Sequence, residues 1–343
     1  MIKKIGLITG GGDSPGINAA IRAIVVKATQ EGYEVLGIRC GWRGLIEDDL
    51  VKLELKDVEG IINTGGTIIG TSRTNPFKIE GGEKAILRTI KKHGIDAIIA
   101  IGGDDTLRVT HKLNSIGVPA VGVPQTIDND LCGTDYCIGF DSAVCIVTDA
   151  IDRLQTTAAS HGRIIVVEVM GRDAGWLTLI PGIAGAANII LVPEDTYDYQ
   201  NIVDRIEERM RRGKNSAIIA VAEGSTPNEV KTQISETYDV DAFGHIRLGG
   251  IAGLLAEELE KRTKLEIRSM NLGHLQRGGN PSPMDRYYST RLGLKAVELI
   301  KEKKFDMMAS VQGQEISATP LEAATCEVKK LSTELIEISK IFG

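Results

Sequence analysis

The side chains best suited to chemistry lie in three short segments, and each segment follows an apolar run. The first segment is Gly-Gly-Gly-Asp-Ser-Pro-Gly at residues 10–16. Glycines allow a backbone to approach a phosphate, and a helix that starts here supplies free N–H groups and partial positive charge. We expect Ser14 to cap that helix and Pro15 to take its first position. The simpler alternative is a tight strand–helix turn, although three consecutive glycines exceed what such a turn needs.

The second segment, Ile-Gly-Gly-Asp-Asp-Thr-Leu at residues 101–107, combines two glycines with two acids. An aspartate at a helix start is often only a residue that complements the helix dipole. The functional alternative is a carboxylate that binds magnesium beside a phosphate loop.

The third segment, Pro-Gln-Thr-Ile-Asp-Asn-Asp at residues 124–130, places Asp128 and Asp130 two positions apart. In an extended chain both carboxylates point the same way. Such a pair can serve as a base and its partner or as metal ligands. The alternative for an isolated pair of this kind on a polar loop is solvated surface.

Strand-like and helix-like stretches alternate along the chain, as expected for parallel sheets covered on both faces. The predicted strands are Lys3–Thr9, Glu34–Cys40, Ala97–Ile101, Ala120–Val123, Arg163–Val169, Ala217–Ala222 and Leu265–Asn271. The predicted helices are Gly16–Glu31, Glu83–His93, Thr106–Ser115, Ser142–Ser160, Gln200–Arg212, Gly249–Thr263, Asp285–Glu302 and a final one around Ser332–Lys340. Residues 225–247 show no clear period and are predicted to be an excursion or a long hairpin, and residues 313–320 a loop.

Composition excludes several classes of protein. Lys and Arg number 40 against 46 Asp and Glu, a net charge of −6 without a basic stripe, so no nucleic-acid partner is expected. The 5 cysteines form no Cys-x-x-Cys pair, which indicates reduced thiols in a cytoplasmic protein. Apolar runs fall far short of the ~20 residues that span a membrane, so no membrane partner is expected. The N-terminus is interpreted as a first strand rather than a signal peptide.

Taken together, motifs along nearly the whole chain resemble the phosphofructokinase family. They are GGDSPGINAAIR, GGTIIGTSR, IGGDDTL, PQTIDND, SHGR, VEVMGRDAGW, AEG and LGHLQRGG, in family order and at compatible spacing. The resemblance implies an α/β fold with two similar three-layer α/β/α lobes, largely parallel sheets and an active site in the interlobe cleft. The donor-binding lobe is expected to comprise residues 1–140 plus about 277–325. The lobe for fructose 6-phosphate is expected to comprise residues 141–276 plus 326–343.

The resemblance also implies Mg²⁺-dependent phosphoryl transfer to the 1-hydroxyl of fructose 6-phosphate, a reaction catalysed mainly by positioning and charge neutralisation. Asp128 is expected to be the general base, Asp130 to polarise or orient the hydroxyl, and Thr126 to contact the transferring phosphoryl. Asp104 is expected to hold Mg²⁺ directly or through water. Arg73 and Arg172 are expected to meet the charge on the transferring group. The expected donor-binding residues are Gly11, Arg73, Gly103, Asp105, Thr106 and Gln125.

The sugar side follows from the same resemblance. Met170, Gly171, Arg172 and Glu223 match positions that hold the fructose ring, and His274 and Arg277 match ligands of its 6-phosphate. Arg163 and Arg268 match arginines that reach this phosphate from a neighbouring subunit. The resemblance therefore implies a homo-oligomer, either a dimer or a tetramer.

Two residues bear on the phosphoryl donor. ATP-dependent members commonly carry glycine where this chain has Asp105. A carboxylate there would repel the α-phosphate of ATP, by roughly 1–4 kcal/mol near 4 Å at effective dielectric constants of about 80 to 20. Pyrophosphate has no group at that point. Pyrophosphate-dependent members usually carry lysine where this chain has Gln125, so the sequence predicts pyrophosphate as donor and keeps ATP as the alternative.

Three other functions are alternatives to this one, and the motifs argue against the first two. A non-catalytic phosphosugar-binding subunit would lack the base or the metal ligand, and both are present here. A dinucleotide-dependent oxidoreductase would carry a Gly-x-Gly-x-x-Gly fingerprint, which is absent. A longer acceptor such as sedoheptulose 7-phosphate is a further alternative. Val26, Leu55 and Gln155 replace arginines expected in the effector site of regulated ATP enzymes, so we expect little response to ADP or phosphoenolpyruvate.

Overall fold

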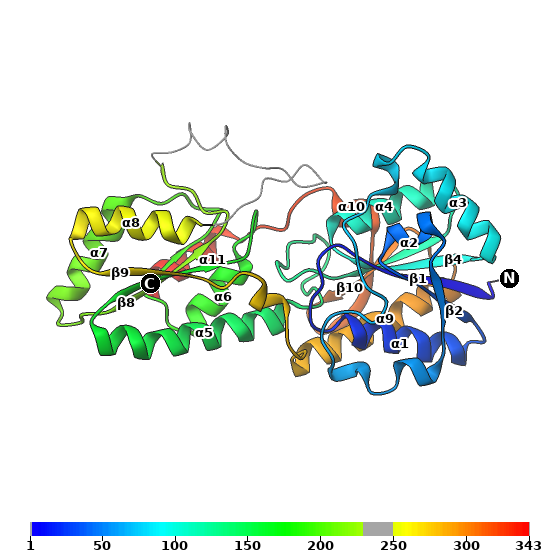
Figure 1. The fold of residues 1–343 in the computed structure, drawn as a ribbon, viewed down its shortest axis with the longest axis horizontal. Helices are drawn as coiled ribbons and strands as arrows, with labels where there is room; N and C mark the ends of the chain where they lie inside the picture. Colours follow the sequence, from blue (N-terminus) through cyan, green and yellow to red (C-terminus); the bar gives the residue numbers. More distant parts are fainter. Residues whose placement is uncertain (1, 229–249, 343) are drawn as a thin grey trace. The chain divides into compact units, whose positions relative to one another are not determined.

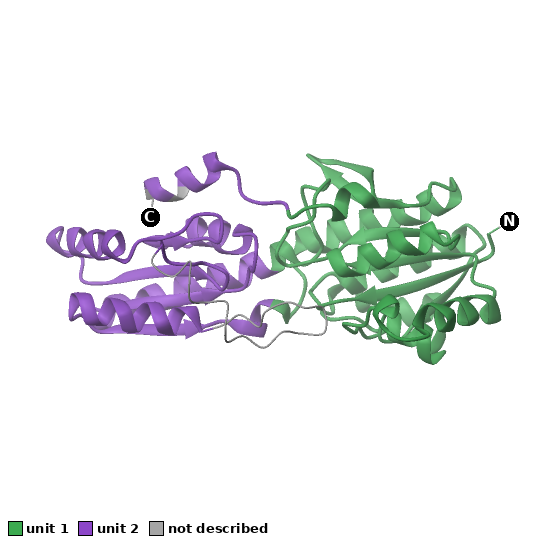
Figure 2. Cartoon of the chain, turned by 90° about the horizontal axis from the view of Figure 1, so that it is seen from above, with its two compact units in different colours: residues 1–142, 277–328 green, residues 143–276, 329–343 purple. Residues whose placement is uncertain are grey.

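The computed structural model describes residues 2–228 and 250–342. The chain divides into two compact units, each made of two stretches of sequence (Figure 2). Unit 1 comprises Met1–Ser142 and Arg277–Val328, and unit 2 comprises Ala143–Gln276 and Lys329–Gly343. Most of the excursion predicted for residues 225–247 lies outside the described residues.

Unit 1 is built on a seven-stranded sheet with the order β11-β10-β5-β4-β1-β2-β3 (Figure 1). Its strands are β1 (Lys4–Gly10), β2 (Glu34–Ile38), β3 (Leu50–Leu53), β4 (Ala97–Gly102), β5 (Ala120–Pro124), β10 (Met307–Gln312) and β11 (Glu315–Pro320). The five inner strands run parallel, and the edge strands β3 and β11 run antiparallel to their neighbours. The central strand β4, Ala-Ile-Ile-Ala-Ile-Gly, is buried along its whole length, as a strand covered on both faces requires.

Helices cover both faces of this sheet. They are α1 (Ile17–Gln30), α2 (Trp42–Glu47), α3 (Gly82–His93), α4 (Asp104–Ser115), α9 (Pro283–Lys301), α10 (Leu321–Thr325) and the start of α5 (Phe140–His161). One apolar cluster joins α1 and α9 to the sheet, and a second joins α2, α3 and α4 to its other face. At Gly293 of α9 a β-carbon would lie 2.8 Å from the Ala20 carbonyl oxygen, so glycine permits the close packing of α9 on α1. Short 3₁₀ turns complete the unit: η1 (Leu55–Val58), η2 (Ile61–Asn63) and η3 (Pro76–Lys78).

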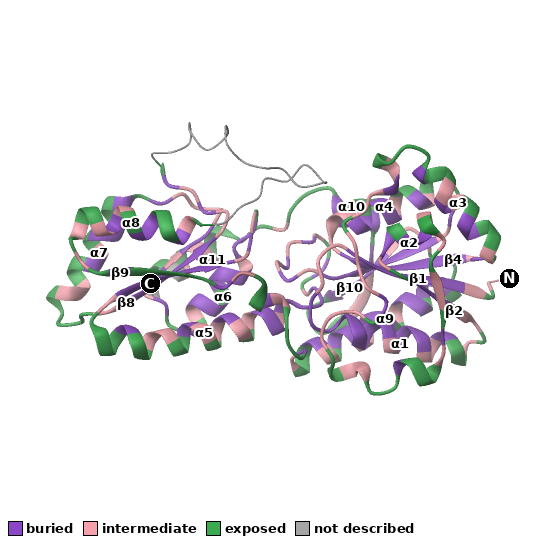
Figure 3. Ribbon diagram, viewed as in Figure 1, coloured by how far each residue is buried: buried purple, intermediate pink, exposed green. Residues whose placement is uncertain are grey.

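Unit 2 has a four-stranded, fully parallel sheet with the order β7-β8-β6-β9. Its elements are β6 (Ile164–Val169), α6 (Trp176–Ala184), β7 (Ile189–Leu191), α7 (Tyr199–Arg211), β8 (Ala217–Ala222), α8 (Ile251–Thr263), β9 (Ile267–Asn271), η6 (Gly273–Arg277, which ends in unit 1) and α11 (Thr333–Phe342), together with most of α5. Helices α7 and α8 share one apolar cluster with the sheet, and α6 and α11 pack together in another. In Figure 3 the buried residues gather along the strands and the inner helix faces of each unit.

The predicted α/β class with largely parallel sheets is confirmed, and most central elements agree with the prediction to within about two residues. The loop predicted for residues 313–320 is wrong, because β11 pairs with β10 through a hairpin with Gly313 at φ 61°. This edge strand is only partly buried, so its sequence lacks the apolar run that marks the inner strands. Within the described residues, no helix combines the length and the apolarity that a membrane crossing needs.

Candidate active site

The three segments singled out in the sequence, residues 10–16, 101–107 and 124–130, lie side by side at one edge of the unit 1 sheet. Strands β1, β4 and β5 are neighbours, and their ends are level because Gly10 pairs with Gly102 and Gly102 with Pro124. The chain continues in opposite directions from β1 and β4, since β2 lies next to β1 on one side and β5 lies next to β4 on the other. Ligands of such sheets bind at this point of reversal, beyond the carboxyl ends of the strands.

The glycines of the first two loops make room for one side chain. A β-carbon on Gly10 or on Gly102 would lie 2.6 Å from an atom of Thr106. Thr106 is itself buried, and its hydroxyl therefore lies beneath the loops. Close packing at this point brings the two loops together.

The prediction for the start of α1 is wrong. The helix begins at Ile17, after Gly16 in the left-handed region at φ 105°, so Ser14 does not cap it and Pro15 lies before its first position. Ser14 is fully buried, and its hydroxyl donates to the Ile138 carbonyl oxygen at 3.3 Å. The local sequence pattern favoured a cap, but a contact 124 residues away uses the side chain.

A fourth loop, residues 70–73, is fixed to the first. The Gly11 N–H donates to the Ser72 carbonyl oxygen at 3.1 Å, and the Thr71 hydroxyl donates to the Gly11 carbonyl oxygen at 2.8 Å. Arg73 is exposed and follows these contacts directly. Arg73 therefore directly follows a loop that is hydrogen-bonded to Gly11.

The loop after β5 differs from the extended form that the sequence suggested. Asn129 has φ 51°, in the left-handed region, so Asp128 and Asp130 do not alternate along an extended chain. The Asn129 side chain stabilises this turn, because its Oδ1 accepts from Cys137 N at 3.0 Å and its Nδ2 donates to the Asp135 carbonyl oxygen at 3.2 Å. The Thr126 hydroxyl oxygen accepts from Asp128 N at 3.1 Å.

Three carboxylates nevertheless share one electrostatic environment. Burial raises the pKa of Asp130 to about 7, the charges of Asp128 and Asp104 add to this rise, and hydrogen bonds that include the Thr126 hydroxyl oppose it. Asp104 begins α4 and forms an ion pair with Arg108 (Nε to Oδ2, 2.7 Å). Asp105 follows in the same helical turn, and Gly103 lies against the backbone of Gln125. Burial and like charges both favour the protonated form of Asp130. Within the described residues, no group of three or more His, Cys, Asp or Glu side chains is placed to hold a metal ion.

The raised pKa of Asp130 predicts a pH-dependent stability. The folded protein keeps this proton between the ordinary pKa of 3.8 and about 7, where the unfolded chain has lost it, so this carboxyl makes folding less favourable as pH rises through that window. In metal-free buffer we expect Asp130→Asn to unfold at higher denaturant concentration than wild type at pH 8, with a much smaller difference at pH 5. Chemical unfolding at both pH values measures this.

The matched control is Asp149→Asn, which alters an exposed aspartate paired with Arg153 on α5. It is expected to change stability little at either pH, since exposed pairs contribute less than about 1 kcal/mol. An Asp130→Asn difference that is the same at pH 5 and pH 8 contradicts the prediction.

A buried carboxylate that the sequence did not reveal holds the chain just after this loop. Asp285 of α9 is fully buried and accepts hydrogen bonds from Gly139 N and the Tyr136 hydroxyl, both at 2.7 Å, and from Ser142 N at 2.8 Å. Burial raises the pKa of Asp285, and these hydrogen bonds oppose the rise. The only sequence signal was an acid in the first turn of a helix, which is usually a solvated residue.

Arg277 lies against the glycine loop of unit 1. A β-carbon on Gly12 would lie 2.4 Å from Nη1 of the Arg277 guanidinium, so this side chain packs directly on the glycine loop. Arg277 Nε is buried and makes no hydrogen bond within the described part of the chain. The structure thus places this residue, predicted to bind the sugar 6-phosphate, next to the predicted donor loop.

In unit 2 the predicted sugar-binding residues gather at the carboxyl ends of three adjacent strands. Met170, Gly171 and Arg172 follow β6, Glu223 follows β8, and His274 follows β9. Glu223 N donates to the Val169 carbonyl oxygen at 2.9 Å, and Gly224 lies against the Arg172 carbonyl group. His274 is exposed. The fold therefore brings these five residues to one edge of the sheet.

Two buried side chains that the sequence did not single out hold this edge together. Gln276 Oε1 accepts from Met170 N at 3.2 Å, and its Nε2 donates to the Gly273 carbonyl oxygen at 3.0 Å. Glu168 accepts from Gly250 N and Ala252 N at 3.0 Å and from Asn271 Nδ2 at 2.6 Å. Glu168 lies in the motif VEVMGRDAGW and Gln276 in LGHLQRGG. Membership of these motifs was the only sequence feature that pointed to them.

Arg163 and Arg268 are not part of this edge. Arg163 precedes β6 at its amino end, and Arg268 pairs with Ile165 one residue into that strand. Both guanidinium groups contact the Glu266 carboxylate, at 2.9 Å and 2.5 Å. The six residues of β6 separate Arg163 from Met170, which amounts to roughly 20 Å of strand.

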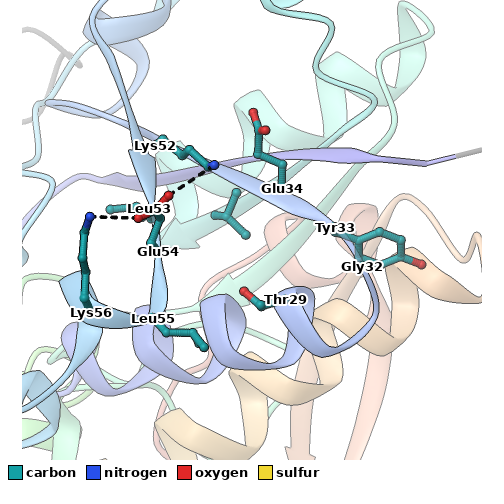
Figure 4. Close-up of a pocket in the computed structure, with 10 residues that line it drawn as sticks. Thr29, Gly32, Tyr33, Glu34, Lys52, Leu53, Glu54, Leu55 and Lys56 are labelled. Atoms are coloured by element: carbon teal, nitrogen blue, oxygen red, sulfur yellow. Dashed lines mark ion pairs between the residues drawn. The ribbon is translucent and has the colours of Figure 1, made fainter.

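Unit 1 also has an open groove of about 510 Å³ between the end of α1 and the β2–β3 edge (Figure 4). Leu55, which replaces an expected effector-site arginine, lines it and is 51% exposed. Lys52 and Lys56 also line it, and both pair with Glu54, at 3.2 and 2.9 Å. These pairs leave little positive charge for an anionic effector.

The chain is similar to known proteins in sequence and in structure. The model of the family described as phosphofructokinase matches residues 4–300. The chain is 49% identical over 340 residues to a pyrophosphate–fructose 6-phosphate 1-phosphotransferase of Amycolatopsis methanolica, covering 99% of both chains. It is 46% identical to ATP-dependent 6-phosphofructokinase 2 of Clostridium perfringens, covering 100% of this chain and 98% of that one. The crystal structure of Pichia pastoris phosphofructokinase in the T-state superposes with a TM-score of 0.84 at 30% identity, and this chain spans 36% of that longer one.

Proposed function

Because the chain belongs to the phosphofructokinase family, we propose that it transfers a phosphoryl group from pyrophosphate to the 1-hydroxyl of fructose 6-phosphate. The products are fructose 1,6-bisphosphate and phosphate. The enzyme is a phosphotransferase of the pyrophosphate-dependent kind. This reaction is close to balanced in free energy, so it runs in both directions.

The observation that supports pyrophosphate as donor is Asp105 in the first turn of α4. This helix follows β4, where the connections from β4 and β1 lead to opposite sides of the sheet. The carboxylate occupies the place that glycine leaves open in ATP-dependent members, and it repels an α-phosphate. Relatives named for either donor are similar to this chain at 49% and 46% identity, so overall identity does not separate the two donors. ATP is the second candidate, because Gln125 replaces the lysine of most pyrophosphate-dependent members.

Donor binding in unit 1 uses backbone N–H groups and nearby arginine. The glycine loop at residues 10–12 and the start of α4 meet above Thr106, and Arg73 directly follows a loop that is hydrogen-bonded to Gly11. Helix N-termini and glycine loops bind phosphate oxygens through free N–H groups. The guanidinium groups of Arg73 and Arg172 stabilise the charge that spreads over the transferring phosphoryl.

The sugar hydroxyl loses its proton to Asp128. A hydroxyl is a weak nucleophile, and a carboxylate that accepts its proton as the phosphoryl approaches accelerates the transfer. Asp130 orients this pair, and Thr126 holds the loop and contacts the transferring phosphoryl. Burial, together with the charges of Asp128 and Asp104, raises the pKa of Asp130.

The carboxylates of this site fit Mg²⁺. The cation usually binds one or two carboxylates together with phosphates and waters, and Asp104 with its neighbours Asp128 and Asp130 offers carboxylate oxygens whose mutual repulsion a cation relieves. Asp104 would hold it once Arg108 gives up its ion pair. When bound, the ion neutralises phosphate charge.

The sugar ring binds at the carboxyl edge of the unit 2 sheet. Met170, Gly171, Arg172 and Glu223 hold the ring and its hydroxyls. His274 and Arg277 bind the 6-phosphate, and the buried Nε of Arg277, which has no hydrogen-bond partner among the described residues, supports this role. Unit 1 accordingly acts as the donor-binding lobe and unit 2 as the sugar-binding lobe.

The active form is a homo-oligomer. Arg163 and Arg268 lie at the opposite end of β6 from Met170, too far to reach a sugar phosphate bound at the carboxyl edge of their own sheet. They are therefore available to the site of a second copy, once a phosphate replaces Glu266 as their partner.

The experiment that tests this function follows product formation. Purified protein with Mg²⁺, fructose 6-phosphate and pyrophosphate is expected to yield fructose 1,6-bisphosphate, and fructose 1,6-bisphosphate with phosphate is expected to regenerate pyrophosphate. ³¹P NMR resolves all four phosphorus compounds. Binding of fructose 6-phosphate without turnover by either donor points instead to a non-catalytic phosphosugar-binding protein.

A further inference from the structure

We propose that Gln125 is a positioning residue that acts through Ser14, and that this buried pair holds the donor loop and the base loop in one arrangement for whichever donor binds. The proposal rests on the proposed phosphoryl transfer and deepens it. It assigns Ser14 a part in the reaction. It also gives Gln125 a different part from the direct donor contact that its position predicts.

The contact lies inside unit 1. Gln125 is 3% exposed and Ser14 is 0% exposed. Gln125 Nε2 donates to Ser14 Oγ at 3.0 Å, and Ser14 Oγ donates to the Ile138 carbonyl oxygen at 3.3 Å. One of the two N–H donors of the Gln125 amide is therefore used within the protein, and the side chain is buried.

The pair joins segments that are far apart in sequence. Ser14 belongs to the glycine loop after β1, and Gln125 directly precedes Thr126 and the base Asp128 after β5. Backbone contacts support the same junction, because Gln125 N donates to the Gly102 carbonyl oxygen and Ile138 N to the Pro124 carbonyl oxygen, both at 3.0 Å. The side chain of Gln125 thus connects the loops after β1 and β5, and its backbone N–H connects the same point to the end of β4.

Glycine at position 139 and the carboxylate of Asp285 hold the other side of the junction. Gly139 has φ 98°, and a β-carbon there would overlap the Ser14 hydroxyl. Its N–H donates to Asp285 Oδ1 at 2.7 Å. The Ser14 hydroxyl is thus enclosed by backbone that is itself anchored, so its position is fixed.

The remaining polar atom of the pair also indicates a positioning role. Gln125 Oε1 is buried and has no hydrogen-bond partner within the described residues. A carbonyl oxygen cannot donate to a phosphate oxygen. Burying this acceptor without a partner lowers the stability of the folded protein. We infer that the side chain is kept for the position that it gives to Ser14 rather than for stability.

The two roles predict different kinetics. A direct donor ligand, when removed, raises KM for one donor and changes the preference between donors. A positioning pair, when broken, lowers kcat with both donors by a similar factor, because small misplacements of reacting groups are costly. The preference for pyrophosphate over ATP then stays the same.

The test uses Ser14→Ala, Gln125→Met and the double variant in the full-length enzyme. Methionine keeps the length of the side chain and removes the amide. Each single variant is expected to lose about tenfold or more in kcat with pyrophosphate, with KM for fructose 6-phosphate and the ratio of the two donors changed less than about twofold. The double variant is expected to lose no more than the worse single variant, because both substitutions break one interaction.

The control is Thr325→Val, which removes another buried hydroxyl of unit 1, one that donates to the Leu321 carbonyl oxygen at 2.9 Å in α10. It is expected to alter thermal stability without a change in kcat. Losses in the two single variants that multiply in the double variant overturn the proposal, as does a shift in donor preference with Gln125→Met. Unchanged kcat in variants that only melt at lower temperature also overturns it.

Failure of the proposed function is recognised separately. If wild-type protein prefers ATP, the same variants are compared with ATP, and the expected non-additive loss in kcat is the same. If wild type turns over neither donor, the proposed function fails, and so does the proposal that rests on it.

Discussion

Asp128→Asn is expected to lower kcat with pyrophosphate by at least about 10², because the amide cannot accept the proton of the sugar hydroxyl. The substitution keeps the size of the side chain, so the loop that Asn129 and Thr126 shape should persist. Affinity for fructose 6-phosphate should change only a few-fold, since binding depends mainly on residues of unit 2 and on Arg277. Initial rates give kcat, and isothermal titration with fructose 6-phosphate gives the affinity.

Two controls accompany this variant. Asp128→Ser also lacks a base and should lose activity to a similar extent, which separates the loss of the carboxylate from an effect peculiar to asparagine. Asp149→Asn, at an exposed position of α5, should retain wild-type kcat. Turnover within about threefold of wild type in Asp128→Asn rejects Asp128 as the general base.

Asp105→Gly is expected to change kcat/KM for ATP relative to pyrophosphate by about tenfold or more in favour of ATP. This equals about 1.4 kcal/mol of transition-state free energy, within the range expected when a carboxylate near an α-phosphate is removed. Pyrophosphate lacks the repelled group, so its own kcat/KM should fall less than ATP use rises. Initial rates with each donor over a range of concentrations measure both values.

Two further substitutions divide the effect between charge and volume. Asp105→Asn removes the charge and keeps the size, whereas Asp105→Ala removes both and avoids the loss of helix stability that glycine causes in the first turn of α4. If charge dominates, Asn and Ala improve ATP use equally; if volume dominates, only Ala and Gly do. A donor preference unchanged in all three variants shows that Asp105 does not discriminate between donors.

The inner strands of the fold were predictable because burial on both faces imposes a clear sequence pattern. Strands buried on both faces are continuous apolar runs, such as Ala97–Gly102, and glycines at their ends mark the loops. Edge strand β11 was not predictable in the same way, because residues 315–320 are only partly buried and read as a polar loop. Short strands such as β7, with three residues, give too little pattern to recognise.

The composition of the site was easier to predict than its geometry. The motifs identify which residues gather at the sheet edges, because a residue that directly follows a parallel strand must lie there. They do not show what each side chain contacts. Ser14 reads locally as a helix cap but binds Ile138, and the turn at Asn129 depends on Cys137 and Asp135.

Residues that act from a distance were the hardest to find. Asp285 lies 146 residues from Gly139, and Gln125 lies 111 residues from Ser14, so no local pattern links either pair. Each pair can be recognised only in the folded structure, where a buried carboxylate or amide forms a hydrogen bond with a distant loop. Their roles follow from burial and distance rather than from residue type.

The central claim is that pyrophosphate is the preferred donor, and a direct competition tests it best. The enzyme receives fructose 6-phosphate, Mg²⁺ and equal concentrations of pyrophosphate and ATP, and ³¹P NMR follows the early loss of pyrophosphate and the formation of ADP. The ratio of the two rates equals the ratio of the kcat/KM values. We expect pyrophosphate to be consumed at least about tenfold faster, which corresponds to about 1.4 kcal/mol. Faster formation of ADP contradicts the assignment and shows that Asp105 does not exclude ATP in this protein.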